Sequence, residues 1–140
     1  MPTSPQVLQR IDEAYQTQAT SLDLSRCGLT EVPPELKRLA PFLNDLDVGD
    51  NQLGAEGARE LAKLSNLTSL DVSFNQIGVE GARELANLSN LTSLDVYSNQ
   101  LGAEGAREMA KLSNLTSLDV VSNQIGGEGA REVANLSALA

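Results

Sequence analysis

The 140-residue chain has 10 basic and 19 acidic residues, a net charge of −9 and no histidine. Its acidity argues against nucleic acid or an anionic membrane as the main partner, and the missing histidines remove the commonest general base and zinc ligand. Its single cysteine, Cys27, excludes an internal disulfide and a multi-cysteine metal site, and its aromatic content of 3% means that Leu, Val, Ile and Ala must form the core.

The first segment has the features of a capping helix. Ser4 can cap a helix whose first position is Pro5. The apolar positions that fall on one side of this helix are Leu8, Ile11 and Tyr15. We expect a helix over residues 5–16, within an N-terminal cap spanning residues 5–18, because the first layer of a repeat array needs a cover.

A 24-residue repeat follows the cap. The stretch Leu-Thr-Ser-Leu-Asp-Val-x-x-Asn that ends at Asn75 recurs 24 residues later, ending at Asn99, and again ending at Asn123. Stepping backward finds related units, the first with Cys27 at the Asn position. Alternation of Leu, Asp and Val in each unit predicts a strand with one buried face. The chain therefore reads as a single domain over residues 1–140, with repeats that start near residues 19, 43, 67, 91 and 115.

The second half of each repeat is predicted to be a helix. In the third repeat, Ala82 and Leu85 share an apolar face, while Glu80 and Arg83 point outward at a spacing that permits an i,i+3 ion pair. Gly81 and Ala82 carry almost no side chain, so we expect this helix to lie close against the strand layer.

The first and last repeats depart from this pattern. Pro33 and Pro34 exclude an ordinary helix interior from the first repeat. Residues 128–136 are expected to finish a fifth helix, and no capping segment follows it. The strand edge at residues 116–121 would then either pair with another copy or belong to a piece of a longer protein.

The repeats match the pattern L-x-x-L-x-L-x-x-N/C-x-L and so resemble leucine-rich repeats. The Gly-Ala-Arg-Glu-Leu-Ala stretch resembles ribonuclease-inhibitor-like repeats and, more narrowly, the bacterial GALA-type class, over roughly residues 43–140. The resemblance implies an α/β solenoid, a horseshoe arc with five parallel strands on its concave face and helices on its convex face. It also implies interaction with other proteins. The expected structural ladder, in which each polar side chain bonds backbone inside the solenoid, is Cys27, Asn51, Asn75, Asn99 and Asn123.

One row of the concave face is constant. The residues at this position are Asp23, Asp47, Asp71, Asp95 and Asp119. Strands lie ~4.8 Å apart, so five carboxylates would stack across ~19 Å. Asp45 and Asp50 add negative charge near the N-terminal end of this row. Either the row attracts a basic partner, or duplication has simply propagated a tolerated solvent-facing residue.

Two further columns of the concave face vary between otherwise similar repeats. The first reads Ser25, Gly49, Ser73, Tyr97 and Val121, and the second reads Arg26, Asp50, Phe74, Ser98 and Ser122. Phe74, Tyr97 and Val121 would form an apolar strip across the acidic row, as binding hot spots often do. The alternative is that these are isolated exposed residues without a role.

These features predict a module that binds another protein, a basic one if the acidic row has a role, and neither nucleic acid nor membrane. The predicted contact residues are Asp23, Arg26, Asp45, Asp47, Asp50, Asp71, Phe74, Asp95, Tyr97, Asp119 and Val121. We expect no enzyme activity, cofactor or metal site. The alternative function is a structural or engineered scaffold that self-assembles, for example as a homodimer, through the C-terminal edge strand. No signal peptide or membrane-spanning run is recognisable, so a cytoplasmic location is expected, with secretion as an effector left open.

Overall fold

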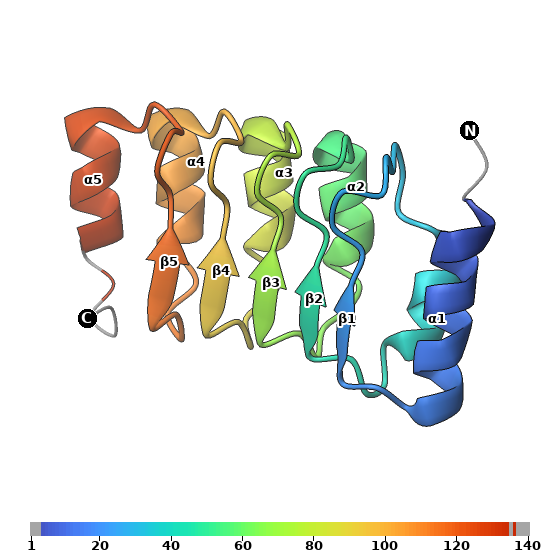
Figure 1. Cartoon of the computed structure of the whole chain (residues 1–140). Coiled ribbons are helices and arrows are strands. Elements are labelled where there is room, and N and C mark those ends of the chain that lie inside the picture. Colours follow the sequence, from blue (N-terminus) through green and yellow to red (C-terminus); the bar gives the residue numbers. More distant parts are fainter. Residues whose placement is uncertain (1–3, 135, 137–140) are drawn as a thin grey trace.

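In the part of the chain that the structure describes, five short strands lie side by side in one parallel sheet, with a row of helices behind them (Figure 1). The computed structural model describes residues 4–134 and 136. The strands run in the order β1 (Ser21–Asp23), β2 (Asp45–Asp47), β3 (Ser69–Asp71), β4 (Ser93–Asp95) and β5 (Ser117–Asp119). The helices are α1 (Pro5–Thr17), the 3-10 helix η1 (Pro34–Leu39), α2 (Gly54–Leu61), α3 (Gly78–Leu85), α4 (Gly102–Met109) and α5 (Gly126–Ala134). The predicted α/β solenoid is therefore confirmed.

The core is a thin layer between the sheet and the helices. The second, third and fourth repeats each contribute the central residue of the strand, the Val two positions later and a long apolar residue from the helix. In the third and fourth repeats these residues are fully or almost fully buried: Leu70, Val72, Leu85, Leu94, Val96 and Met109. Burial of regular Leu and Val positions replaces the large aromatic side chains that the composition lacks.

Small residues bring neighbouring helices together. A Cβ placed on Gly81 would lie 2.6 Å from the Cβ of Ile77 and 3.3 Å from the Cβ of Ala58 in α2. A Cβ on Gly129 of α5 would lie 3.1 Å from the Cβ of Ala106 in α4. The expectation that Gly81 serves packing against the strands is thus wrong, because its closest neighbours are its own helical turn and the preceding helix.

The outer surface of the helices carries ion pairs within and between repeats. Glu80 pairs with Arg83, as predicted, but Arg83 also reaches Glu104 of the next repeat at 3.4 Å. Arg107 approaches Glu128 of the following repeat at 2.8 Å. All of these side chains are about half exposed or more, so each pair contributes little to the free energy of unfolding.

Helix α1 caps the array and buries Ile11 as predicted, but Val7 and Ala14 lie beside it on the buried face in place of Leu8 and Tyr15. The Ser4 Oγ accepts the Val7 N–H at 3.3 Å, as expected, and the helix runs one residue past position 16. The buried side chains are Val7, Ile11 and Ala14. Tyr15 is 41% exposed, and the Arg38 guanidinium lies 4.0 Å from the centre of its ring. Docking against η1 selects the Val7 face, because a helix buries the stripe that meets its neighbour.

The two end repeats follow the sequence expectations only in part. The prolines do exclude an ordinary helix, and η1 begins at Pro34. Helix α5 ends at Ala134 rather than at 136, and Leu136 is buried beyond it. In β5 and after it, Leu118 and Val120 are only partly buried. Self-assembly through this edge stays a prediction. Among the described residues, no helix combines the length and apolar character needed to cross a bilayer.

Candidate functional site

The asparagine ladder is structural and lies beneath the open face of the sheet. The Asn75 Nδ2 donates to the carbonyl of Val48 at 2.8 Å and to that of Val72 at 3.1 Å. Its backbone N–H donates in turn to the Oδ1 of Asn99 at 2.9 Å. Asn51, Asn75, Asn99 and Asn123 are all buried, so this predicted ladder is confirmed.

Cys27 occupies the first rung of the ladder. We expected this position to be buried, but Cys27 is only partly buried. Its N–H donates to the Asn51 Oδ1 at 3.1 Å, while its Sγ donates to the Ser25 carbonyl at 3.3 Å and lies 3.6 Å from the Arg10 Nη1. Among the described strands none precedes β1, and α1 covers the first rung only in part. The burial prediction for Cys27 is therefore wrong in degree.

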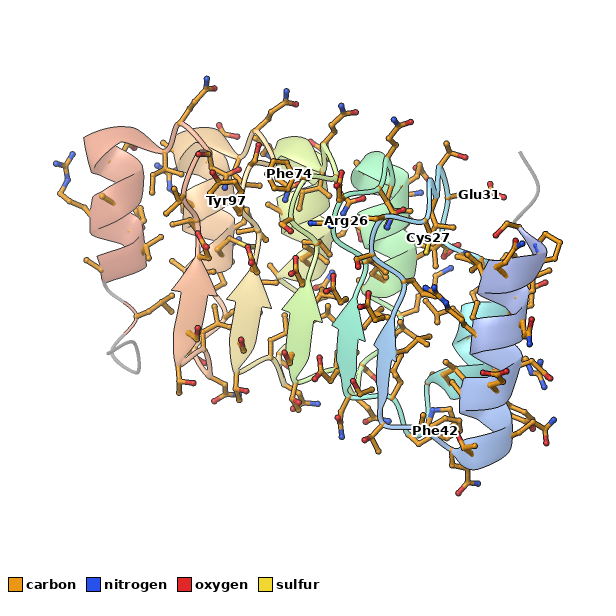
Figure 2. All side chains as sticks on the ribbon, in the orientation of Figure 1. Arg26, Cys27, Glu31, Phe42, Phe74 and Tyr97 are labelled. Carbon is orange, nitrogen blue, oxygen red and sulfur yellow. The ribbon has the colours of Figure 1, made fainter. Side chains whose placement is uncertain are left out.

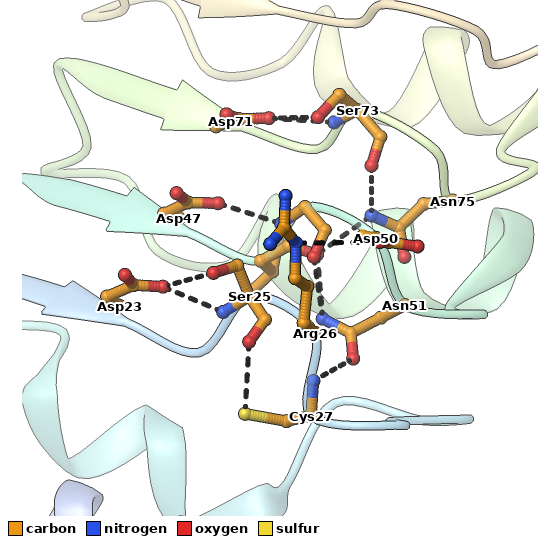
Figure 3. Close-up of polar contacts among 12 residues, drawn as sticks. Asp23, Ser25, Arg26, Cys27, Asp47, Asp50, Asn51, Asp71, Ser73 and Asn75 are labelled. Atoms are coloured by element: carbon orange, nitrogen blue, oxygen red, sulfur yellow. Dashed lines mark hydrogen bonds and ion pairs between the residues drawn. The ribbon is translucent and has the colours of Figure 1, made fainter.

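The constant aspartates form the predicted row on the open face of the sheet. The one-to-one register places Asp23 beside Asp47, Asp47 beside Asp71, and so on to Asp119. In every repeat the Oδ1 also accepts the backbone N–H two residues later, as Figure 3 shows for the first repeats. The donors are Ser25 (2.8 Å), Gly49 (2.9 Å), Ser73 (2.9 Å), Tyr97 (3.0 Å) and Val121 (3.0 Å). Sequence reasoning missed this turn-closing bond, although Asp is a typical residue for it.

Two carboxylates inside the row, those of Asp47 and Asp95, ionise less readily than an ordinary aspartate. Burial, reinforced by neighbouring carboxylates, raises the pKa of Asp47 and that of Asp95 above the ordinary value. Hydrogen bonds from the Ser25 hydroxyl and N–H lower the pKa of Asp23. The inner carboxylates therefore repel one another across strands, whereas the first is locally satisfied.

Asp95→Asn should stabilise the protein at neutral pH. A raised folded-state pKa means that the folded protein holds the Asp95 proton more tightly than the unfolded chain does. Protonated Asp95 therefore stabilises the fold at low pH, and this stabilisation is lost as pH rises through the folded-state pKa. Asn keeps the oxygen that accepts the Tyr97 N–H but removes the charge. We expect a gain of about 0.2–1 kcal/mol at pH 7, measured by urea unfolding, that fades in acid.

Asp95→Ala is the matched control because it removes the charge and the acceptor together, and it should be less stable than Asp95→Asn. Equal free energies of unfolding for wild type and Asp95→Asn at pH 7 would show that the carboxylate row carries no strain.

The aromatic residues of the variable columns meet on the open face. The ring centres of Phe74 and Tyr97 lie 5.2 Å apart at an angle of 55°. In Figure 2 Phe74 lies between Tyr97 and Arg26 along the sheet. Phe74 is 50% exposed and Val121 is 59% exposed. The structure thus joins two members of the predicted strip, while Val121 stands in the neighbouring repeat beside Tyr97.

The backbone at Phe74 has a conformation that bulky residues seldom adopt. Its φ is +56°, in the left-handed region, as are the equivalent residues Arg26, Asp50, Ser98 and Ser122. A non-glycine residue pays about 1–2 kcal/mol in this conformation, and a bulky ring is uncommon there. Keeping a large exposed ring at a strained position is typical of a functional surface.

A hollow opens in the open face between Arg26 and Phe74. It has a volume of about 220 Å³ and is lined by Ser25, Arg26, Asp47, Gly49, Asp50, Asp71, Ser73 and Phe74. Gly49 stands where the flanking repeats have Ser25 and Ser73, and it lines this space beside Asp47 and Asp71. We call this space the Gly49 hollow.

Of the other predicted contact residues, Asp45 lies at the opposite end of β2 from the hollow. Among the described residues, no three Asp, Glu or Cys side chains converge as ligands for a metal ion.

Comparison with known proteins identifies consecutive repeats along most of the chain. A family model described as a leucine-rich repeat matches residues 40–62, 63–86, 87–110 and 111–134, and a second leucine-rich-repeat model matches residues 18–39. No curated protein matches the chain. The narrower GALA-type resemblance stays a prediction.

Among solved structures the chain is similar to a leucine-rich-repeat protein of Leptospira interrogans, with 28% identity and a TM-score of 0.68 over 89% of this chain and 32% of that one. It is also similar to an internalin of Listeria monocytogenes, with 26% identity and a TM-score of 0.48 over 93% of this chain and 49% of that one. The chain therefore spans at most about half the length of these proteins. With five consecutive repeats matched over most of its length, the chain belongs to the leucine-rich-repeat family.

Proposed function

We propose that the protein binds a basic segment of another protein on the open face of its sheet. Leucine-rich-repeat proteins generally mediate interactions between proteins, and the open face defines the chemistry here. The observation that carries the proposal is the Phe74–Tyr97 ring pair set within an uninterrupted row of carboxylates. Among ion pairs of the described residues, none engages Asp47, Asp71, Asp95 or Asp119.

Charge and apolar area favour the same partner. Burial and, to a smaller extent, neighbouring carboxylates raise the pKa of Asp47 and Asp95, and cations from a partner would stabilise the charged form of both. The two rings supply the apolar contact that anchors an interface, since aromatic residues ringed by polar groups dominate binding energy.

Binding fits the geometry better than catalysis. The carboxylates lie in a row on an open sheet and use an oxygen each to close a turn, instead of converging on one point with different environments as an acid and a base do.

Selection from a random peptide display library tests the proposal. We expect the recovered peptides to be enriched in Lys and Arg beside apolar residues, and their capture to fall as salt rises. An Asp71→Asn/Asp95→Asn variant should recover few of them.

The control for that variant is Glu104→Gln/Glu128→Gln, which makes the same change in net charge on the exposed helices. Peptides without an excess of basic residues would contradict the proposal. So would equal losses in the sheet and helix variants, because the attraction would then come from net charge alone.

A further inference from the structure

At the Gly49 hollow, the carboxylates of Asp47 in β2 and Asp71 in β3 both lie close to Gly49. A Cβ placed on Gly49 would lie 2.9 Å from the Ser73 Oγ, 3.1 Å from the Asp47 Oδ1 and 3.2 Å from the Asp71 Oδ1. Among the described hydrogen bonds, both Oδ1 atoms accept backbone N–H groups and neither Oδ2 accepts any. The Oδ2 of each carboxylate therefore keeps its capacity to accept a hydrogen bond from a ligand.

The walls of the hollow suit a flat cation. On one side stands the exposed ring of Phe74, and on the other stands Arg26. A guanidinium is planar, stacks on aromatic rings, forms paired hydrogen bonds with carboxylates and is less strongly hydrated than an ammonium group. A volume of about 220 Å³ admits the end of one such side chain rather than a folded ligand.

The chain already holds a guanidinium at the rim of the hollow. The Arg26 side chain reaches from the first repeat to Asp50, where its Nε lies 3.7 Å from the Asp50 Oδ2 (Figure 3). The two side chains are 83% and 64% exposed, so this ion pair is weak and easily broken. Arg26 thus shows that the surroundings accept a guanidinium, while it stays close enough to be displaced.

We infer that the Gly49 hollow receives one arginine side chain of the basic partner, and that Arg26 competes with it for the rim. This inference rests on the proposed function and deepens it, since it assigns one residue type of the partner to one place on the open face. It also reverses the expectation for Arg26, which acts as an internal competitor instead of a contact that favours binding.

The probe is an acetylated and amidated glycine–serine peptide with one arginine, titrated into the 15N-labelled full chain. We expect the amide signals of Gly49 and Ser73 to shift with the arginine peptide, to shift less with a lysine peptide, and not to shift with a citrulline peptide of the same shape. Citrulline keeps the planar group and removes its charge.

Two variants separate the hollow from the rest of the face. Gly49→Ser adds the side chain that the flanking repeats carry at this position, and the Ser73 hydroxyl, 2.9 Å from the new Cβ, has to turn away to admit it. It should weaken the arginine peptide at least about 10-fold, as loss of a hydrogen bond to a charged group does. Arg26→Gln should tighten the peptide by about 1.5- to 5-fold, the range of one exposed ion pair. Arg131→Gln, which makes the same change in charge on α5, should leave the affinity unchanged.

The outcomes distinguish this inference from the proposed function. Equal affinity of wild type and Gly49→Ser, or weaker binding by Arg26→Gln, overturns the hollow. If library-selected basic peptides still bind Gly49→Ser normally but fail on Asp71→Asn/Asp95→Asn, the hollow falls and the proposed function stands. If the selection yields no basic peptides, the proposed function falls. Circular dichroism of each variant establishes that it is folded.

Discussion

Replacing Asn99 with leucine should destabilise the protein by about 4 kcal/mol, because up to four buried backbone groups would each lose a partner at about 1–3 kcal/mol. The Asn99 Nδ2 donates to the carbonyls of Val72 at 2.9 Å and Val96 at 3.0 Å. Its Oδ1 accepts the N–H groups of Asn75 at 2.9 Å and Ile77 at 3.3 Å. Leucine matches the size of the side chain and supplies none of these bonds. Since small domains are stable by only about 5–15 kcal/mol, urea unfolding should show the loss clearly.

Asn90→Leu is the matched control for this prediction. Asn90 is exposed and makes a single bond to the Ser65 carbonyl at 3.0 Å, so its loss should cost less than about 1 kcal/mol. Similar midpoints for Asn99→Leu and Asn90→Leu would mean that the ladder is not what closes the turns of the solenoid.

Removing the ring pair should weaken a library-selected basic peptide about 30-fold, which corresponds to a hot-spot contribution of about 2 kcal/mol. The variants are Phe74→Gly and Tyr97→Ala, measured separately and together by calorimetry. The rings lie 5.2 Å apart, so their effects should not add.

Phe74→Gly should at the same time stabilise the fold. Glycine adopts the +56° φ of this position without the steric cost of a side chain, which would raise the free energy of unfolding by up to about 1 kcal/mol. A gain in stability with a loss of binding is the signature of a residue kept for recognition. Tyr15→Ala, which removes an exposed ring from α1, should leave binding unchanged. Normal binding by the Phe74→Gly/Tyr97→Ala variant would exclude the ring pair as the anchor.

The parts of the structure that depend on the repeat period could be predicted from the sequence. A strict 24-residue spacing implies one-to-one register, so the carboxylate row and the asparagine ladder followed directly. Contacts that depend on which neighbour a segment meets could not. The inward face of α1 is chosen by η1, and the role of Gly81 is set by Ala58 of the preceding helix.

The Gly49 hollow illustrates the same limit within the site. The sequence shows a glycine in a variable column, but only the placement of its neighbours shows that it lines a hollow. The bond from each aspartate to the N–H two residues later was missed for a related reason. It depends on the turn after the strand, whereas the strand pattern alone indicates only that the Asp side chain is exposed and charged.

The regular register also fixes the spacing that a partner lying across the sheet has to match. Successive carboxylates of the row repeat with the strand spacing of about 4.8 Å, whereas an extended peptide returns a side chain to the same side only about every 6.8 Å. An α-helix advances about 5.4 Å per turn and so keeps nearly in step with the row over several repeats. A partner that presents its basic side chains once per helical turn would thus meet one carboxylate per repeat, while an extended partner would drift out of phase after the first contacts.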